Sequence, residues 1–591
     1  MKIINFKKFL CVCLFVVAGV LTTFAIPAHP RPVDVTQSDG SRLTVRLVGD
    51  EFYHRTMTTD GYTLLQRSNG DYVYAVESAS KLIPSDVIAH NPMMRNTGEL
   101  KMLSKLQKGL TDKTMAARGK SMHASRDQLN ASTRTDYKDF RGLLILINYN
   151  DRTFTYGNDY FNDMMNLKDY MGFYREDGSF VPCTGSARDY YYENSMGLFE
   201  PHFDVVGPVT VNYSCTDPHG TSWTVGEIFV AAVDSLDKSI DFSRYDGDGD
   251  GEVDMIYFVV AGYTSNFGGN NSGYLWPHQY YMYYFTSQQY DGVYLGRYSC
   301  SGEIYGWENY GFTDPDGIGT ICHEFTHALG LMDLYDTNYE QEGEANDPGD
   351  WDIMAGGCYM NDSRTPVGFS LWERYRLGFA DPEEITEKRA GYFLLPLNTS
   401  NTGYWLPSPN ENEIFMLENR QNTRWDAYLP GHGMLITRIE YYRSRWASNT
   451  INTNASHMYY EILRAGNGFG SNPNDPFPGT DHVTEINNLT TPNLMTWDGQ
   501  FNEYGLNNIS EKDAIVTFGV VNGDGTTPGH GFELGDVNHD QFVSIADVTA
   551  LIDYLLDASQ EICTVCADVN GNGELTIGDV TALIDLLLGI R

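Results

Sequence analysis

The chain is organised around one segment, Cys322-His323-Glu324-Phe325-Thr326-His327-Ala328-Leu329-Gly330-Leu331-Met332-Asp333. His323 and His327 are four positions apart, so a helix places both imidazoles on one face, where they can hold one zinc ion. Gly330 lets the chain leave the helix sharply, and this turn can return Asp333 to the metal as a third ligand. Three protein ligands with one open position are typical of a catalytic zinc site.

Glu324 follows the first histidine and can reach a water molecule on the zinc. Zinc lowers the pKa of such a water to about 7, so Glu324 could act as the general base and later pass the proton to a leaving amine. Met354 follows the helix by a short loop, where metzincins place a Met-turn beneath the metal. An amphipathic helix with two surface histidines is the simpler alternative, and the fixed offsets of Gly330, Asp333 and Met354 favour the metal site.

The N-terminus has the pattern of a secretory signal peptide over residues 1–25. Lys2, Lys7 and Lys8 precede an apolar run that begins at Phe9, and small residues lead to a cut after Ala25. The run is shorter than the roughly 20 apolar residues that span a bilayer, and no later stretch is long and apolar enough. We therefore expect a secreted protein, extracellular or associated with the cell surface, whose mature chain has no membrane span.

Length and charge narrow the class of protein further. The 591 residues imply several domains, and a net charge of −38 argues against nucleic acid as a partner and suits cation binding. Seven cysteines follow the signal peptide, and their odd number leaves at least one free thiol, of which Cys322 is the candidate for a buried one. Cys563 and Cys566 form a CxxC pair, which indicates either a local disulfide or two idle thiols.

Residues 26–137 are expected to be a β-rich propeptide with a basic connector. Strand-like alternation and the turn Asn69-Gly70 predict a small β-module over residues 33–90. Lysines and arginines then gather between residues 101 and 134, which favours an exposed, cleavable segment. No cysteine lies between the signal peptide and Cys183, so latency of the enzyme must be steric or use a carboxylate.

Residues 138–380 are expected to form the catalytic domain, with strands and helices around a mixed sheet. The apolar runs at residues 143–147 and 255–260 predict buried strands, and residues 186–195 predict a helix. A glycine-rich loop between these elements carries carboxylates at alternate positions, a pattern that suits calcium, although it lacks the final Glu of an EF-hand. The predicted calcium ligands of this loop are Asp246, Asp248, Asp250 and Asp254.

These motifs together resemble the immune inhibitor A family of secreted bacterial metallopeptidases. The similarity rests on the segment from His323 to Asp336, on Trp351 to Gly357, on the Asp246 loop and on Arg188-Asp189-Tyr190, and it extends through Leu417-Glu418-Asn419-Arg420-Gln421 and Gly431 to Ile436. It covers roughly residues 138–521 and implies a metzincin-like fold. It also implies zinc on His323, His327 and Asp333, with Glu324 as the base.

Residues 381–521 show short apolar runs separated by Gly, Asn and Pro, which predicts a β-sandwich companion domain. A linker at residues 522–533 leads to residues 534–591, where a loop and a leucine-rich helix occur twice with a period of 32 residues. This repeat resembles a type I dockerin, a small α-helical calcium-binding domain, and implies a cohesin-bearing scaffold or cell-surface protein as partner. Its expected calcium ligands are Asp536, Asn538, Asp540, Ser544 and Asp547 in the first loop, and Asp568, Asn570, Asn572, Thr576 and Asp579 in the second.

The sequence therefore predicts an α+β multidomain protein that acts as a zinc-dependent endopeptidase on protein substrates. Two alternatives remain open. A protease of the gluzincin type would take its third ligand from a later helix, with Glu373 as candidate, but the compact offset of Asp333 and the position of Met354 favour the first assignment. A catalytically inactive protease-like binding protein, displayed by its dockerin, is the other, and the intact His323, Glu324, His327 and Asp333 disfavour it.

Overall fold

The computed structural model describes residues 26–50, 53–78, 81–112, 140–220, 222–268, 271, 273–337, 344–527, 534–538, 543–557 and 562–588. The predicted signal peptide lies outside these residues, as do most of the basic connector, the second half of the linker and Asp540 of the first dockerin loop. Among the described residues, no helix has the length and apolar character needed to cross a membrane.

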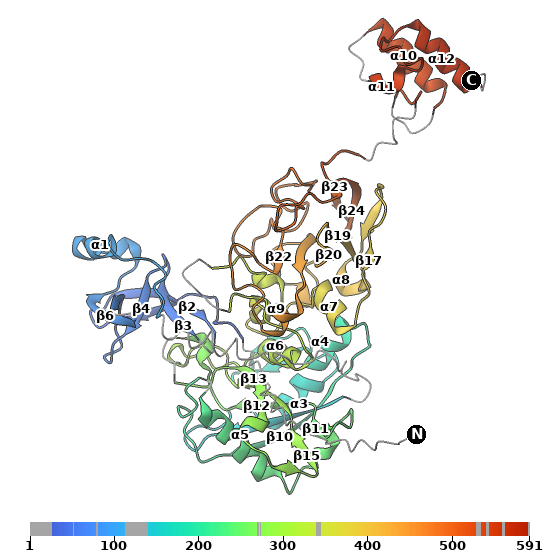
Figure 1. Cartoon of the computed structure of the whole chain (residues 1–591). Helices are drawn as coiled ribbons and strands as arrows, with labels where there is room; N and C mark the ends of the chain where they lie inside the picture. The colour runs from blue at the N-terminus through green and yellow to red at the C-terminus, as the bar shows by residue number, and fades with distance from the viewer. Residues whose placement is uncertain are drawn as a thin grey trace, which may run out of the picture.

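The N-terminal module, residues 26–112, is a six-stranded antiparallel sheet whose strands follow one another in sequence order. The strands are β1 (Val33–Thr36), β2 (Arg42–Gly49), β3 (His54–Thr58), β4 (Thr63–Gln66), β5 (Tyr72–Ser78) and β6 (Lys81–Ile88), and helix α1 (Thr97–Leu103) follows them. The predicted turn at Asn69-Gly70 joins β4 to β5, and Gly70 has the positive φ that such a turn requires. The module stands beside the body of the molecule, with β2 and β3 nearest to it (Figure 1).

The central domain, residues 140–380, is built on a five-stranded mixed sheet in the order β10-β7-β12-β16-β13. The first four strands are parallel and β13 is antiparallel, as the sequence predicted for a mixed sheet. Their bounds are β7 (Arg141–Asn148), β10 (His202–Thr210), β12 (Ile256–Val260), β13 (His278–Tyr281) and β16 (Arg297–Gly302). The two apolar runs predicted as buried strands are β7 and β12, which pair in the middle of the sheet.

Helices cover both faces of this sheet, because successive residues of a strand point to opposite faces. Leu144 and Leu146 of β7 join one apolar cluster with helices α3 (Asn158–Asn166), α4 (Ala187–Asn194) and α6 (Ile318–Ala328). Leu143, Ile145 and Ile147 join another with helix α5 (Trp223–Leu236). The smaller strands of this domain are β8 (Gly172–Tyr174), β9 (Phe180–Pro182), β11 (Glu252–Val253), β14 (Gln289–Tyr290) and β15 (Val293–Leu295).

Helix α6 carries the two histidines and is buried along its whole length. Its backbone is tied to neighbours on two sides: Ser299 of β16 donates to the carbonyl of Glu324, and the Tyr191 hydroxyl of α4 donates to the carbonyl of Cys322. These contacts fix the position of α6 along its axis and its rotation about that axis, relative to the sheet. Helix α7 (Leu371–Leu377) closes the domain.

The β-rich domain, residues 381–527, contains two sheets that enclose one apolar core. One sheet has the order β17-β19-β20-β21-β22 and the other β18-β24-β23. Their elements are β17 (Glu383–Glu384), β18 (Tyr392–Leu394), α8 (Leu397–Ser400), β19 (Tyr404–Pro407), β20 (Glu413–Arg420), β21 (Gly433–Glu440), α9 (Arg443–Ala447), β22 (Tyr460–Ile462), β23 (Tyr504–Lys512) and β24 (Ile515–Asn522). This domain lies against the central domain on the side of α6 and α7 (Figure 1).

A buried arginine joins the two domains. Arg420 at the end of β20 pairs with Glu418 and Asp426, and it also donates to the carbonyl oxygens of Trp351 and Gly368 in the central domain. Because a buried guanidinium must find a partner for each N–H group, this network holds the segment around Met354 against the β-rich domain.

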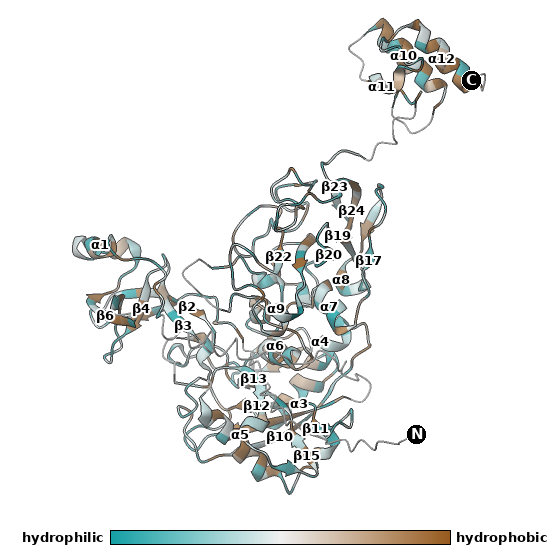
Figure 2. Cartoon of the chain, in the orientation of Figure 1, coloured by the Kyte–Doolittle hydropathy of each residue, from teal (hydrophilic) through white to brown (hydrophobic). Residues whose placement is uncertain are grey.

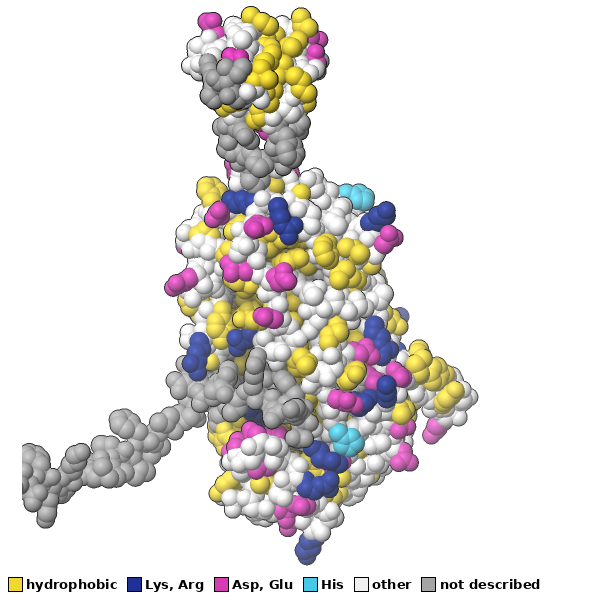
Figure 3. Space-filling view, turned by 90° about the vertical axis from the view of Figure 1, so that its right-hand side faces the viewer, with side chains coloured by type: hydrophobic (Ala, Val, Ile, Leu, Met, Phe, Trp, Pro, Cys, Tyr) yellow, Lys and Arg dark blue, Asp and Glu magenta, His cyan; other side chains and the backbone are white. Residues whose placement is uncertain are grey.

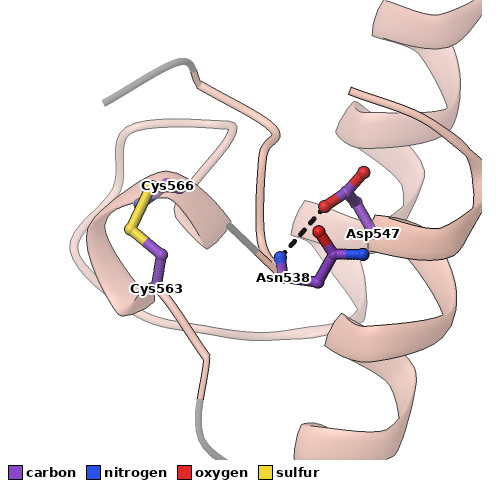
Figure 4. The surroundings of a disulfide bond; sticks show 4 residues. All are labelled: Asn538, Asp547, Cys563 and Cys566. Atoms are coloured by element: carbon purple, nitrogen blue, oxygen red, sulfur yellow. Dashed lines mark hydrogen bonds between the residues drawn. A yellow bond between two sulfur atoms is a disulfide. The ribbon is translucent and has the colours of Figure 1, made fainter. Parts of the chain in front are cut away.

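The C-terminal domain, residues 534–588, consists of α10 (Ile545–Leu556), α11 (Thr564–Ala567) and α12 (Ile577–Leu587), and polar and apolar residues alternate around α10 and α12 (Figure 2). Cys563 and Cys566 form a disulfide at the start of α11, close to the first repeat (Figure 4). The other five cysteines outside the signal segment are all free, and Cys322 is buried, as the sequence predicted.

Candidate metal centre

Three buried side chains converge at the C-terminal half of α6. The Nε2 atoms of His323 and His327 lie 3.2 Å apart, and Asp333 Oδ1 lies 3.4 Å from the first and 3.2 Å from the second. A zinc ion about 2.0–2.1 Å from each donor in tetrahedral geometry separates the donors by roughly 3.3 Å. The triangle therefore has the size that zinc requires. Within the described part of the chain, Asp333 Oδ1 accepts no hydrogen bond, although it is buried.

Backbone carbonyls orient the two imidazoles. His323 Nδ1 lies 2.7 Å from the carbonyl oxygen of Ile353, and His327 Nδ1 lies 2.9 Å from that of Leu331. A carbonyl oxygen can only accept, so Nδ1 carries the proton in both rings and Nε2 presents its lone pair to the centre of the triangle. The segment after the helix and the segment around Met354 thus each set the tautomer of one candidate ligand.

The glycine turn has the geometry that the sequence predicted. Gly330 has φ +104°, a region that other residues rarely adopt, and its N–H donates to the carbonyl of His327. Beyond it, the N–H of Leu334 donates to the carbonyl of Met354, and the Met354 side chain is fully buried in the main apolar cluster. The turn and this backbone contact together return Asp333 to the two histidines.

Asn449 orients Asp333, and sequence reasoning missed it. Its amide Nδ2 donates to Asp333 Oδ2 at 2.7 Å, and its Oδ1 accepts from the Asp333 N–H at 2.9 Å. This double contact engages Oδ2 and leaves Oδ1 directed at the histidines. Asn449 comes from the β-rich domain, 116 residues away in sequence, so no local pattern could connect the two.

Glu373, the candidate ligand of the gluzincin alternative, lies outside this group of metal-binding atoms. It forms a capping box at the start of α7, where its Oε2 accepts from the N–H of Ser370 at 2.7 Å. The structure therefore places Asp333, rather than Glu373, beside the two imidazoles.

Glu324 is buried beside this centre and contacts the N-terminal module. Its Oε1 accepts a hydrogen bond of 2.7 Å from the backbone N–H of Ile26. The carbonyl of Ile26 accepts from Trp276 Nε1 at 3.0 Å, and that of Pro27 accepts from the Tyr359 hydroxyl at 2.6 Å. Three residues on, the N–H of His29 donates to the carbonyl of Asn266. The segment from Ile26 to His29 therefore lies along the central domain and covers Glu324, which the sequence did not reveal.

The acidic loop of the central domain brings carboxylate oxygens of Asp246, Asp248 and Asp250 within 4.8 Å of one another. Asp254 lies beside this group, and its Oδ2 accepts from the N–H of Gly247 at 3.0 Å. Burial, together with the charges of the neighbouring aspartates, raises the pKa of Asp254 to about 6. A cation in the loop would relieve this repulsion.

The second dockerin loop repeats the geometry of that acidic loop. Asp246 accepts from the N–H groups four and five residues later, and Asp568 does the same. Glycines with positive φ stand three and five positions after each aspartate. In both dockerin loops the last ligand candidate also accepts from the N–H of the second candidate. Asn538 donates to Asp547 at 3.0 Å (Figure 4), and Asn570 donates to Asp579 at 3.2 Å. Ser544 and Thr576 make equivalent contacts with the same aspartates, and Asn572 accepts within the second loop.

Two histidines one turn apart on a buried helix, a glutamate between them and an aspartate returned by a glycine turn form the type of site found in zinc metallopeptidases. Comparison with known families agrees with this class. Residues 147–377 match the immune inhibitor A peptidase M6 catalytic domain, and residues 534–588 match the dockerin type I domain. The resemblance inferred from the motifs is therefore confirmed: the chain carries a peptidase M6 catalytic domain and a type I dockerin.

Two curated relatives are similar over part of the chain. Immune inhibitor A of Bacillus thuringiensis subsp. alesti is 29% identical over 227 residues, which are 33% of this chain and 31% of the relative. Pre-pro-metalloprotease PrtV of Vibrio cholerae serotype O1 (strain M66-2) is 27% identical over 173 residues, 25% of this chain and 18% of the relative. The chain thus spans less than a third of the length of either relative.

The contact between Asn449 and Asp333 predicts a measurable effect on metal affinity. Asn449 has a positive φ, so Asn449→Gly removes the amide without straining the backbone. Loss of a group that orients a metal ligand typically lowers affinity by about 10- to 100-fold. Zinc affinity, measured by competition with a chromogenic chelator, should fall by that factor, whereas the exposed Asn454→Gly should match the parent. Equal affinities in the two variants would show that Asn449 does not position the ligand.

Proposed function

We propose that the chain is a secreted, zinc-dependent endopeptidase that cleaves protein substrates and is held at a partner by its dockerin. The observation that supports this most directly is the buried triangle of His323, His327 and Asp333, together with a buried Glu324 that follows His323 on the same helix. The site fits zinc in donor type, spacing and imidazole tautomer. Bound zinc would polarise the peptide carbonyl and lower the pKa of a water molecule to about 7.

Glu324 is the proposed general base and, later in the reaction, the general acid. A carboxylate in this place can take a proton from a water molecule on the zinc and later return it to the reactants. Its Oε1 already accepts from a peptide nitrogen, that of Ile26, at hydrogen-bond distance. The same oxygen is therefore placed to deliver a proton to the nitrogen of a leaving amine.

Substitutions of Glu324, Asp333 and Glu373 distinguish the proposed general base from the proposed metal ligand. Glu324→Ala should retain zinc and lose at least about 10²–10⁴-fold in rate, because it removes proton transfer and no ligand. Asp333→Ala should lose zinc, because two imidazoles alone hold it weakly. Glu373→Ala should retain zinc. Bound metal is measured by mass spectrometry, and activity by hydrolysis of a denatured protein with propeptide-free enzyme.

Two results would contradict this assignment. Zinc retained by Asp333→Ala and lost by Glu373→Ala would establish the gluzincin arrangement instead. A zinc-loaded parent protein that hydrolyses no substrate would favour the inactive binding protein displayed by its dockerin.

Calcium is the proposed ligand of the acidic loop at Asp246 and of both dockerin loops. The shared geometry of the loops at Asp246 and Asp568 supports one ligand chemistry for both. Ile545 and Ile577 occupy equivalent positions in the two repeats, and each is 72% exposed. Figure 3 shows hydrophobic side chains gathered on one side of the C-terminal domain. This surface suits a cohesin-type protein partner with an apolar contact region.

The dockerin loops should depend on calcium for their fold. From Leu534 onward the chain has eight Asp and two Glu against one Arg, so without cations its charges repel one another. A calcium-selective chelator should unfold a fragment of residues 531–591, and circular dichroism measures the loss of its helices. Asp579→Asn should weaken calcium binding in this fragment, whereas Asp553→Asn, in helix α10 outside the loops, should not. An unchanged spectrum after chelation would count against calcium as the structural ligand.

Latency is the proposed role of residues 26–137. Signal peptide removal after Ala25 would make Ile26 the first residue, and its nitrogen is already at Glu324. With no acyl group before Ile26, the segment offers no bond to cleave and blocks the site sterically. The basic connector, most of which lies outside the described residues, is the proposed place of the activating cut.

Acid should loosen the N-terminal segment through His29. Its Nδ1 accepts from the N–H of Arg31 and its Nε2 lies 2.8 Å from the Tyr305 hydroxyl, so the bound ring is neutral. Burial, and next the charge of Arg31, lowers the pKa of His29 from 6.5 to about 3. The affinity of the N-terminal segment for the central domain is thus greatest above pH 6.5. It falls about tenfold per pH unit below pH 6.5, until about pH 3.

The measurement uses protein nicked in the connector, from which residues 26–112 can dissociate. Lowering the pH from 7 to 5 should raise the dissociation constant about 25-fold, as measured by gel filtration and fluorescence anisotropy. His29→Gln should remove most of this pH dependence, because glutamine does not titrate. Equal pH dependence in the parent and His29→Gln would exclude His29 as the cause.

A further inference from the structure

The segment that covers Glu324 has a defined chain direction relative to the candidate site. The nitrogen of Ile26 lies at Glu324 Oε1, and the chain leaves in the order Pro27, Ala28, His29. This inference rests on the proposed function, in which Glu324 gives its proton to the leaving amine. The atom that receives this proton is the nitrogen of the residue after the cleaved bond. Ile26 therefore occupies the place of that residue, and His29 the place of the fourth residue after the bond.

The side chain of Ile26 occupies an apolar site. It is 0% exposed and belongs to the same apolar cluster as residues of α4 and α6. Its carbonyl is fixed by Trp276 Nε1, a donor that any peptide residue could use at this point. The backbone contact is thus independent of sequence, whereas the buried side chain requires an apolar group of about this size.

The ring of His29 lies in a box of four aromatic side chains, all from the central domain. The ring centroids of Tyr359 and Phe267 are 4.7 Å and 5.0 Å from it, and those of Trp307 and Tyr305 are 5.4 Å and 5.8 Å. Three of the rings meet His29 edge-on, at 74° to 87°, and Phe267 is tilted by 32°. Such a slot accepts a flat ring better than a branched or charged side chain.

The box also has one polar group and one backbone anchor. The Tyr305 hydroxyl lies 2.8 Å from His29 Nε2, so a ring with a polar edge is satisfied there. The carbonyl of Asn266 accepts from the N–H of His29, and the Asn266 side chain donates to the Tyr359 hydroxyl. All these groups remain on the central domain when the N-terminal segment leaves. Three residues of chain reach at most about 10 Å, so the box lies within about that distance of the peptide contact at Glu324.

We propose that the N-terminal segment binds as a substrate does. After the segment leaves, the site of the Ile26 side chain and the aromatic box around His29 become two substrate subsites. The substrate class is then a peptide with a branched aliphatic residue directly after the cleaved bond and a flat ring, Tyr, Phe or His, at the fourth position after it. Residues before the cleaved bond have no counterpart in the described part of the segment.

The first test measures binding, which does not require turnover. The probe is the peptide Ile-Pro-Ala-His-Pro-Arg-Pro-Val with a free amino terminus, added to propeptide-free protein that retains Glu324 and carries bound zinc. Replacing its first residue by Asp should weaken binding by at least about tenfold, since a charge would enter an apolar site. His→Ala at the fourth position should weaken it about three- to tenfold, and His→Tyr should restore it. Equal affinity of all four peptides would overturn the proposal.

The second test measures hydrolysis of quenched fluorescent peptides by the propeptide-free enzyme at pH 7.5. The value of kcat/KM should be about tenfold or more higher for Ile than for Asp after the cleaved bond, and about three- to tenfold higher for Tyr than for Ala at the fourth position. Trp307→Leu should abolish the preference for Tyr, and Tyr294→Leu, a change at an exposed ring on β15, should retain it. Cleavage without either preference overturns the two subsites and leaves the proposed peptidase intact. A lack of cleavage together with discriminating binding would overturn the proposed activity and retain the subsites.

Discussion

The convergence of two imidazoles and one carboxylate in a single buried place is the constraint on which the rest of the structure depends. An ionised carboxylate without a partner is costly to bury, and Asp333 Oδ1 has no hydrogen bond among the described residues. A divalent cation between these groups would satisfy them all. The sheet, α4 and the Arg420 network serve to hold this arrangement in position.

The parts of the site that are close in sequence could be predicted, because their spacing alone determines their geometry. His323 and His327 share a helix face by periodicity, Gly330 supplies a conformation that few residues adopt, and the dockerin loops are repeated within the chain. The buried strands β7 and β12 are continuous apolar runs for the same local reason.

The parts that depend on tertiary contact could not be predicted. Asn449 reaches Asp333 across 116 residues, and Ile26 reaches Glu324 across 298. Neither contact corresponds to a recognisable motif in the sequence around these residues. The sequence likewise left open whether Glu373 is a ligand and whether Cys563 and Cys566 are bonded, because both answers depend on which atoms the fold brings together.

The central claim is that His323, His327 and Asp333 hold one zinc ion. Anomalous diffraction from crystals of the purified protein, recorded on both sides of the zinc absorption edge, tests it most directly. We expect a single strong zinc peak about 2.0–2.2 Å from the Nε2 atoms of both histidines and from Asp333 Oδ1. A zinc peak that lies elsewhere, or one bound by the two histidines with a different third residue, would contradict it.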